Sequence, residues 1–136
     1  MFQHSSARFD QTFSYDRTLI SPGILHLGVG AFHRAHMAAY VDAILGTQND
    51  WGIIGASLRR PDTKLALAPQ DFCYTLATRD EASTRTRLIG SVLDILDAHT
   101  QRGELLARLA DPRIRIVSLT VTEKGYCYDL ARRTFQ

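Results

Sequence analysis

Residues 23–36, GILHLGVGAFHRAH, place two glycines between a short apolar run and a stretch suited to a helix. Ile24 to Leu27 predicts a buried strand, and no glycine or proline interrupts residues 31–45. A strand that turns into a helix at Gly28 and Gly30 is typical of a dinucleotide-binding fold, where the helix N-terminus faces a pyrophosphate. His33 stands where that pattern has a third glycine. Because the third glycine serves helix–strand packing, we expect His33 to shift the helix and spare the anion site.

The segments after this turn predict a βαβ unit. An apolar stripe at helical spacing follows the glycines, at Met37, Val41, Ile44 and Leu45. Gly46 suits the end of that helix. Residues 51–58, WGIIGASL, predict a second strand that is buried on both faces. We expect the two strands to be parallel and joined by a right-handed crossover.

The middle of the chain predicts a short helix and then a hairpin. Residues 62–69 suit a helix that Asp62 caps. Residues 71–93 alternate on both sides of a polar turn at residues 80–83. This pattern predicts an antiparallel hairpin inserted into the α/β order.

The last segments predict one more helix and one more strand. Residues 100–110 suit a helix whose apolar stripe is Leu105, Leu106 and Leu109, and residues 113–123 form a strong strand. The order is therefore β-α-β, a hairpin, then α-β, which predicts an α/β fold with an incomplete Rossmann-like parallel sheet. A complete sheet of this kind needs a second half, so we expect residues 1–136 to be the N-terminal part of such a domain. Unpaired strand edges and exposed apolar surface then make a stable monomer unexpected.

Composition excludes several other classes of protein. Lysine and arginine number 16 against 14 acidic residues, and the basic residues are scattered, which disfavours nucleic-acid binding. No apolar run approaches the ~20 residues that cross a bilayer. The two cysteines lie far apart in the sequence, which indicates no disulfide framework and a reducing, cytoplasmic setting.

The stretch SLRRPD, which follows the second strand, lies where a dinucleotide fold meets the adenine ribose. A carboxylate there favours NAD through the ribose 2′-hydroxyl, whereas an arginine accommodates the phosphate of NADP. Arg59, Arg60 and Asp62 supply both signals, so the choice of cofactor stays open. Asp62 has a second interpretation, as the cap of the next helix.

His33 and His36 are three residues apart and could share a helix face, as metal ligands do. Neither an acidic residue nor a cysteine lies near them in the sequence. A metal site is therefore only the third hypothesis. We expect instead that His33 and Arg34 shape the mouth of the cofactor crevice.

Longer stretches resemble the mannitol dehydrogenase family, the polyol-specific long-chain dehydrogenases and reductases. The likeness runs from Tyr15 to Asp129, through YDRTLISPGILHLGVGAFHRAHMAAYVD, WGIIGASLR, LAPQDFCYTL, RLIGSVLDIL and IRIVSLTVTEKGY. It implies an atypical Rossmann domain followed by a mostly helical C-terminal domain, which holds a catalytic lysine that this chain lacks. It also implies hydride transfer between NAD(P) and a polyol or a keto sugar such as a hexuronate, without zinc.

The resemblance also implies roles for particular residues. Its pyrophosphate turn corresponds to Gly28, Gly30, Ala31 and Phe32, and its ribose region to Arg59, Arg60 and Asp62. The family resemblance makes NAD the expected cofactor. Arg60 stands where NAD-preferring relatives often have an acid, so NADP is kept as the alternative. Glu123 matches a glutamate that assists proton passage near the catalytic centre, and its other interpretation is a solvated carboxylate at a strand end. Lys124 replaces a glycine that many relatives have.

Two functions follow for the chain. The first is the cofactor-binding part of an oxidoreductase of the mannitol 2-dehydrogenase or fructuronate reductase type, inactive by itself because the catalytic lysine lies elsewhere. The alternative is a truncated, non-catalytic module that binds a nucleotide or a partner. Polyol or keto-sugar turnover by the 136 residues would contradict the expected inactivity. The expected partners are a small-molecule substrate in the intact enzyme and either a C-terminal domain or a second copy of the chain.

Overall fold

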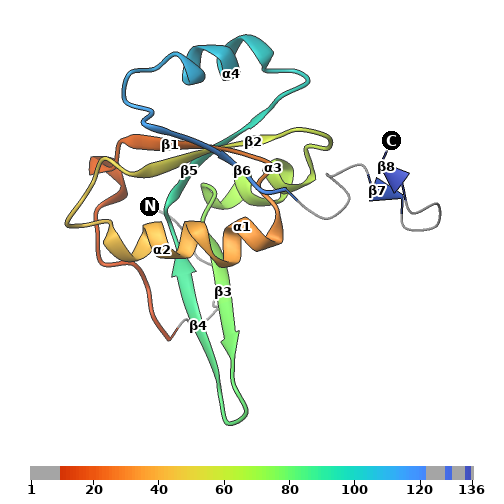
Figure 1. Cartoon of the computed structure of the whole chain (residues 1–136). Coiled ribbons are helices and arrows are strands. Elements are labelled where there is room, and N and C mark those ends of the chain that lie inside the picture. Colours follow the sequence, from red (N-terminus) through yellow and green to blue (C-terminus); the bar gives the residue numbers. More distant parts are fainter. Residues whose placement is uncertain (1–9, 122–127, 130–133, 136) are drawn as a thin grey trace.

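A computed structural model gives the fold, and it describes residues 10–121, 128–129 and 134–135. A four-stranded sheet lies at its centre, in the order β5-β2-β1-β6 (Figure 1). The strands are β1 (Pro22–Leu27), β2 (Gly52–Ser57), β5 (Val92–Asp97) and β6 (Ile116–Leu119). All three neighbouring pairs are parallel. This arrangement confirms the predicted α/β fold with an incomplete Rossmann-like sheet.

The strand order contains a reversal next to β1. The chain moves outward from β1 to β2 and then to β5, and it returns to pair β6 with the opposite edge of β1. In open parallel sheets, ligands bind outside the carboxyl ends of the strands at such a reversal. The strand order therefore predicts a ligand site at the carboxyl ends of β1 and β6.

The helix predicted over residues 31–45 is broken in two. Its parts are α1 (Ala31–Ala35) and α2 (Met37–Ile44), and His36 between them has φ −118° and ψ −84°. The imidazole Nδ1 of His36 lies 2.9 Å from the Phe32 carbonyl oxygen. The His36 backbone N–H also donates to this carbonyl, at 3.1 Å, so the break lies in the backbone angles of His36, which hydrophobic spacing does not reveal.

The apolar stripe of this segment is only partly buried. Val41 and Leu45 belong to the core, whereas Ile44 is 40% exposed. Gly46 has φ +99° just after the helix, as expected for a residue that ends one. Figure 1 shows α1 and α2 on one side of the sheet and α4 (Arg102–Leu109) on the other.

The elements that follow β2 are a short helix and a hairpin, and the structure confirms the hairpin but corrects the cap of the helix. β3 (Tyr74–Arg79) and β4 (Thr84–Ile89) form the predicted antiparallel hairpin, which extends away from the sheet (Figure 1). α3 (Asp62–Leu67) forms where a helix was predicted, but Pro61 is its N-cap and Asp62 makes no cap hydrogen bond. The prediction that Asp62 caps this helix was wrong, because the carboxylate pairs with the Arg60 side chain instead.

The sequence prediction missed β5 as a strand of the central sheet. Residues 71–93 were assigned to the hairpin, yet Val92 already pairs with Ile53 of β2. Gly90 and Ser91 separate β4 from β5. Aspartates at residues 94 and 97 interrupt the apolar run, so the segment does not look like a buried strand.

Short elements complete the described chain. They are the 3₁₀ turns η1 (Arg17–Leu19) and η2 (Ala68–Gln70) and the two-stranded pair of β7 (Tyr128–Asp129) with β8 (Thr134–Phe135). No helix among the described residues is both long and apolar enough to span a membrane.

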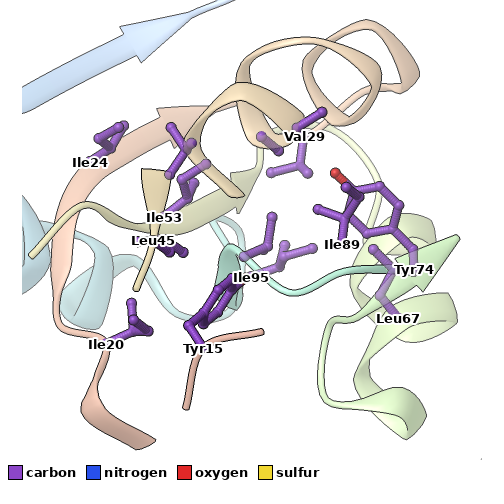
Figure 2. Close-up of a cluster of buried hydrophobic side chains, with 14 residues drawn as sticks. Tyr15, Ile20, Ile24, Val29, Leu45, Ile53, Leu67, Tyr74, Ile89 and Ile95 are labelled. Carbon is purple, nitrogen blue, oxygen red and sulfur yellow. The ribbon is translucent and has the colours of Figure 1, made fainter. Parts of the chain in front are cut away.

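The main core lies between the sheet and the segments on the α2 side (Figure 2). Ile24, Ile53 and Ile95 from three strands meet Leu45 and Tyr15 there. The Tyr15 hydroxyl donates to Asp42 Oδ1 at 2.5 Å, and the Gly90 N–H donates to the same oxygen at 2.8 Å. A buried carboxylate is thus satisfied, and the N-terminal segment is tied to α2 and to the start of β5.

The α4 side of the sheet is covered less completely. No residue of α4 is buried, and Leu106 is 57% exposed. β6 is exposed on both faces, since successive side chains alternate: Ile116, Val117 and Leu119 are 40%, 51% and 57% exposed. β6 pairs with β1 alone among the described strands, so the edge of the sheet is open there, as the sequence predicted.

Candidate functional site

A cleft of about 630 Å³ lies at the carboxyl ends of the strands, where their order reverses. Its walls come from the end of β1 and the glycine turn, the loop between β2 and α3, and the end of β6. The lining residues are Leu27, Gly28, Val29, Gly30, Ser57, Leu58, Arg59, Arg60, Asp62, Thr63, Leu119, Thr120 and Val121. A cleft of this volume is within the range of small-molecule and cofactor sites.

The glycine turn has the backbone conformation that the sequence predicts. Gly28 has φ +90°, a region that L-residues with a side chain rarely adopt. Its N–H donates to the Ala56 carbonyl of β2 at 2.8 Å, which fixes the turn to the sheet. The Gly30 N–H donates to the Gly28 carbonyl, also at 2.8 Å. Both glycine N–H groups are therefore used in hydrogen bonds within the fold.

Gly30 leaves open space beside the backbone. A Cβ added there would find its nearest heavy atom, the Gly28 oxygen, 4.0 Å away. Gly30 is also the N-cap of α1 and supplies no side-chain acceptor to the first helical N–H groups. This open backbone fits a group that approaches closely, as a pyrophosphate does in dinucleotide folds.

Ala31 and Phe32 begin α1 beside the turn and are exposed. They are not among the residues that line the cleft. The Phe32 ring stacks on the His36 ring, with centroids 4.2 Å apart. The structure thus brings together Gly28, Gly30, Arg59, Arg60 and Asp62 at one cleft, and it leaves the side chains of Ala31 and Phe32 outside.

The ribose-region candidates lie after β2, as predicted. Arg60 Nε is 3.1 Å from Asp62 Oδ2, and both side chains are largely exposed. An exposed ion pair of this kind is weak, so either partner can exchange it for a ligand group. A carboxylate that could bind the ribose of NAD and an arginine that could bind the phosphate of NADP therefore both lie at this wall of the cleft.

His33 does not lie at the mouth of the crevice, so that prediction was wrong. Its side chain is 1% exposed, and it stacks on His26 of β1 with ring centroids 3.7 Å apart and an interplanar angle of 14°. Arg34 is half-buried and donates from Nη1 to the Val29 carbonyl at 3.1 Å, which braces the turn from behind. Helical spacing alone gave no sign that His33 points inward.

The same burial separates the two proposed metal ligands. His36 is exposed and contacts Phe32, whereas both ring nitrogens of His33 are buried without a hydrogen-bond partner among the described residues. No group of three or more potential metal ligands occurs within residues 10–121 and the two short C-terminal segments that the structure describes.

The His26–His33 pair is held neutral. Burial lowers the pKa of His33 to about 3, and the proximity of His26 and Arg34 adds to this effect. Burial also lowers the pKa of His26, although the Gly28 carbonyl favours its protonated form. Two uncharged rings thus lie beneath the glycine turn.

Gly55 was overlooked as a residue that positions the site. A Cβ at Gly55 of β2 would lie 2.3 Å from Val29 Cγ2. Val29, between the two glycines of the turn, can pack onto the sheet only because Gly55 has no side chain. The glycine in WGIIGASL was a possible signal, since a glycine inside a strand often marks a close approach.

Glu123 and Lys124 lie outside the described residues, so the expected role of Glu123 stays a prediction. The last described residue of that segment is Val121, which lines the cleft.

Comparison with known proteins gives the family. The sequence model of the mannitol dehydrogenase Rossmann domain matches residues 22–134. The chain belongs to the mannitol dehydrogenase family. Its family resemblance extends over the strands, the glycine turn and the hairpin alike.

Individual relatives of this family are similar over most of the chain. Mannitol 2-dehydrogenase of Cereibacter sphaeroides is 48% identical over 120 residues, which are 85% of this chain and 25% of that protein. Mannitol 2-dehydrogenase of Pyricularia oryzae is 42% identical over 120 residues, or 85% of this chain and 24% of that protein. The chain therefore spans about a quarter of the length of these relatives.

Solved structures share the fold. Pseudomonas fluorescens mannitol 2-dehydrogenase, in a ternary complex with NAD and D-mannitol, has a TM-score of 0.81 and 43% identity. The alignment covers 92% of this chain and 26% of that one. A substrate-free D-sorbitol dehydrogenase has a TM-score of 0.80 and 38% identity, with 93% and 27% covered.

Proposed function

We propose that the chain is the cofactor-binding part of an oxidoreductase that transfers hydride between NAD and a polyol or keto sugar. The observation that carries this proposal is the cleft at the reversal of strand order, walled by a glycine turn that leaves its backbone open. The family supports it, and so does the similar P. fluorescens enzyme, which was solved with NAD and D-mannitol. A hexuronate is the alternative substrate.

The residues of the cleft fit a dinucleotide. The open space at Gly28 and Gly30 would receive the pyrophosphate. The N–H groups of Ala31 and Phe32 at the start of α1 would face it, because both glycine N–H groups already donate within the fold. Arg59, Arg60 and Asp62 would meet the adenine ribose, with Asp62 favouring NAD once it leaves Arg60. NAD, when bound, supplies the carbon that accepts hydride from the alcohol.

The proton chemistry is assigned mainly to residues outside the described part of the chain. We propose that Glu123 assists proton passage, because it follows β6 and the cleft-lining Val121 in the sequence. The catalytic lysine that the family resemblance implies has no counterpart among these 136 residues, so we assign no proton-transfer role to a lysine here. A cytoplasmic location accords with Cys73, which is a buried free thiol.

The open edge of β6 favours a second candidate function, a module that binds a nucleotide or a partner without catalysis. Ile116 and Val117 expose apolar surface on a strand whose outer side is unpaired among the described strands. Association of that edge with a further domain or with a second copy would cover it.

Fluorescence titration with NADH and NADPH tests the main proposal. We expect the purified chain to bind NADH, and Gly30→Asp to weaken binding by about tenfold or more, because a carboxylate would face the pyrophosphate. The open space at Gly30 makes misfolding of this variant unexpected. Gly103→Asp is the matched control, since Gly103 of α4 also has open space and lies outside the cleft.

Equal NADH binding by the wild type and Gly30→Asp would remove the glycine turn from the site. Equal losses in Gly30→Asp and Gly103→Asp would indicate a general effect of charge. Tighter binding of NADPH than NADH would assign Arg59 and Arg60 to a 2′-phosphate.

A further inference from the structure

A buried polar cluster that the proposed function does not use lies directly behind the cleft. His26 of β1 contacts two hydroxyls of the β6 segment: Nδ1 lies 2.9 Å from Ser118 Oγ, and Nε2 lies 3.4 Å from Thr120 Oγ1. Thr120 is exposed and lines the cleft, whereas His26 is 2% exposed. One imidazole therefore connects the interior of the sheet with the cleft wall.

His33 fixes the orientation of the His26 ring. The two rings are nearly parallel at 14°, with centroids 3.7 Å apart, so His33 covers one face of His26. His33 itself has two buried ring nitrogens without a partner among the described residues. A core position that leaves both nitrogens unsatisfied is unfavourable, and stacking against His26 is the contact that His33 does make. The stack limits tilting of the His26 ring, and the contacts with Ser118 and Thr120 set the direction of its nitrogens.

The surroundings of His26 and His33 favour the neutral form of both imidazoles. The ionisable groups that act on His33 are His26 from β1 and Arg34 from α1, and both disfavour a proton there. The other groups that face His26 are Ser118, Thr120 and the Gly28 carbonyl. A neutral imidazole offers one donor and one acceptor, so it can order both hydroxyls of β6 at once.

We propose that Thr120 is a further nucleotide-binding residue, and that His26 and His33 are positioning residues that hold its hydroxyl at the cleft wall. This inference rests on the proposed function. Arg59 and Arg60 occupy the β2 side of the cleft and the glycine turn its middle, so Thr120 on the β6 side meets the opposite end of a dinucleotide. The group that it binds is a hydroxyl or amide of the nicotinamide nucleoside half.

Titration of NADH and of AMP against variants of Thr120 tests the inference. We expect Thr120→Val to weaken NADH binding by about three- to tenfold, the range of one hydrogen bond, and Thr120→Ser to retain it. AMP binding should not change, because AMP carries only the adenosine half. Thr78→Val, on the exposed hairpin strand β3, is the matched control.

The role of His26 is tested through His26→Phe, which keeps a ring against His33 and removes both nitrogens. Its loss of NADH affinity should match that of Thr120→Val, and the double variant should lose no more than either single one. Imidazole ¹⁵N spectra of the wild type should show His33 neutral at pH 6, and the His26 signals should shift when NADH is added. Thermal melting separates these effects from unfolding.

The outcomes distinguish this inference from the proposed function. NADH binding that depends on Gly30 but is unchanged in Thr120→Val would overturn the inference alone. A loss of AMP binding in Thr120→Val equal to that of NADH would also overturn it. A wild type that binds no NADH would overturn the proposed function. If unfolding obscures His26→Phe, wild-type His26 signals that stay unchanged when NADH is added would contradict the inference.

Discussion

His33 shows what a single residue of the sequence can and cannot reveal. The sequence predicts that the third glycine is dispensable for the anion site, and the turn at Gly28 and Gly30 indeed forms without it. The burial of the His33 side chain could not be predicted, because helical spacing does not show which face of a short, broken helix packs against the sheet. Burial on His26 is a tertiary contact between β1 and α1.

The neutral His33 makes stability dependent on pH. Its pKa is about 3 in the folded chain and about 6.5 in the unfolded chain, so between these values only the unfolded chain binds the proton. The free energy of unfolding therefore falls as the pH falls from 6.5, by up to about 1.4 kcal/mol per pH unit from this group. We expect His33→Phe to keep the stacking and remove this contribution. Urea unfolding at pH 7.5, 6.0 and 5.0 measures it.

His36→Phe is the control for this experiment, because His36 is exposed. It should keep the wild-type dependence of unfolding free energy on pH. The same acid sensitivity in His33→Phe as in the wild type would show that the proton is taken up elsewhere.

At the scale of elements, predictions from the sequence succeeded where a pattern is local. The hairpin of β3 and β4 follows from alternation around a polar turn, and β1 and β2 follow from apolar runs ended by glycine or polar residues. They failed at β5, where aspartates conceal a strand that is defined by its pairing with β2. The break between α1 and α2 at His36 was also missed, because hydrophobic spacing carries no signal for it.

Gly55 determines how closely the glycine turn approaches the sheet. We expect Gly55→Ala to lower the free energy of unfolding by about 1–3 kcal/mol, since its Cβ would overlap Val29 Cγ2. Displacement of Val29 would move Gly28 and Gly30 with it, so NADH binding should weaken too. Urea unfolding and NADH titration measure the two effects.

The double variant Gly55→Ala with Val29→Ala gives back the space and should recover part of both losses. Gly103→Ala, which adds a methyl group in open space on α4, should lose neither stability nor affinity. An unchanged Gly55→Ala would mean that Val29 can move without disturbing the turn.

At the scale of the whole molecule, the described sheet has two edge strands, β5 and β6, each paired on one side only. The sequence predicts unpaired strand edges and exposed apolar surface, and the structure has exposed apolar side chains on β6. A cleft lies at the glycine turn, where the sequence predicts the cofactor site. The contribution of Thr120 to the wall of this cleft emerged only from the pairing of β6 with β1. The glycine turn can thus be predicted from adjacent residues of the sequence, whereas the other walls of the cleft depend on contacts between distant segments.

The open β6 edge predicts self-association of the chain. Val117 is 51% exposed on a strand with unpaired backbone, so a second copy can cover both the side chain and the edge. A lysine there must lose water on association, and we expect Val117→Lys to weaken it by about tenfold, or about 1.4 kcal/mol. Sedimentation velocity over a range of concentrations measures the association constant.

Leu106→Lys is the control for this experiment. Leu106 of α4 is 57% exposed, close to the 51% of Val117, but lies away from the edge, so this variant should associate like the wild type. A wild type that stays monomeric at high concentration would contradict the prediction, since the β6 edge would then be stable in water.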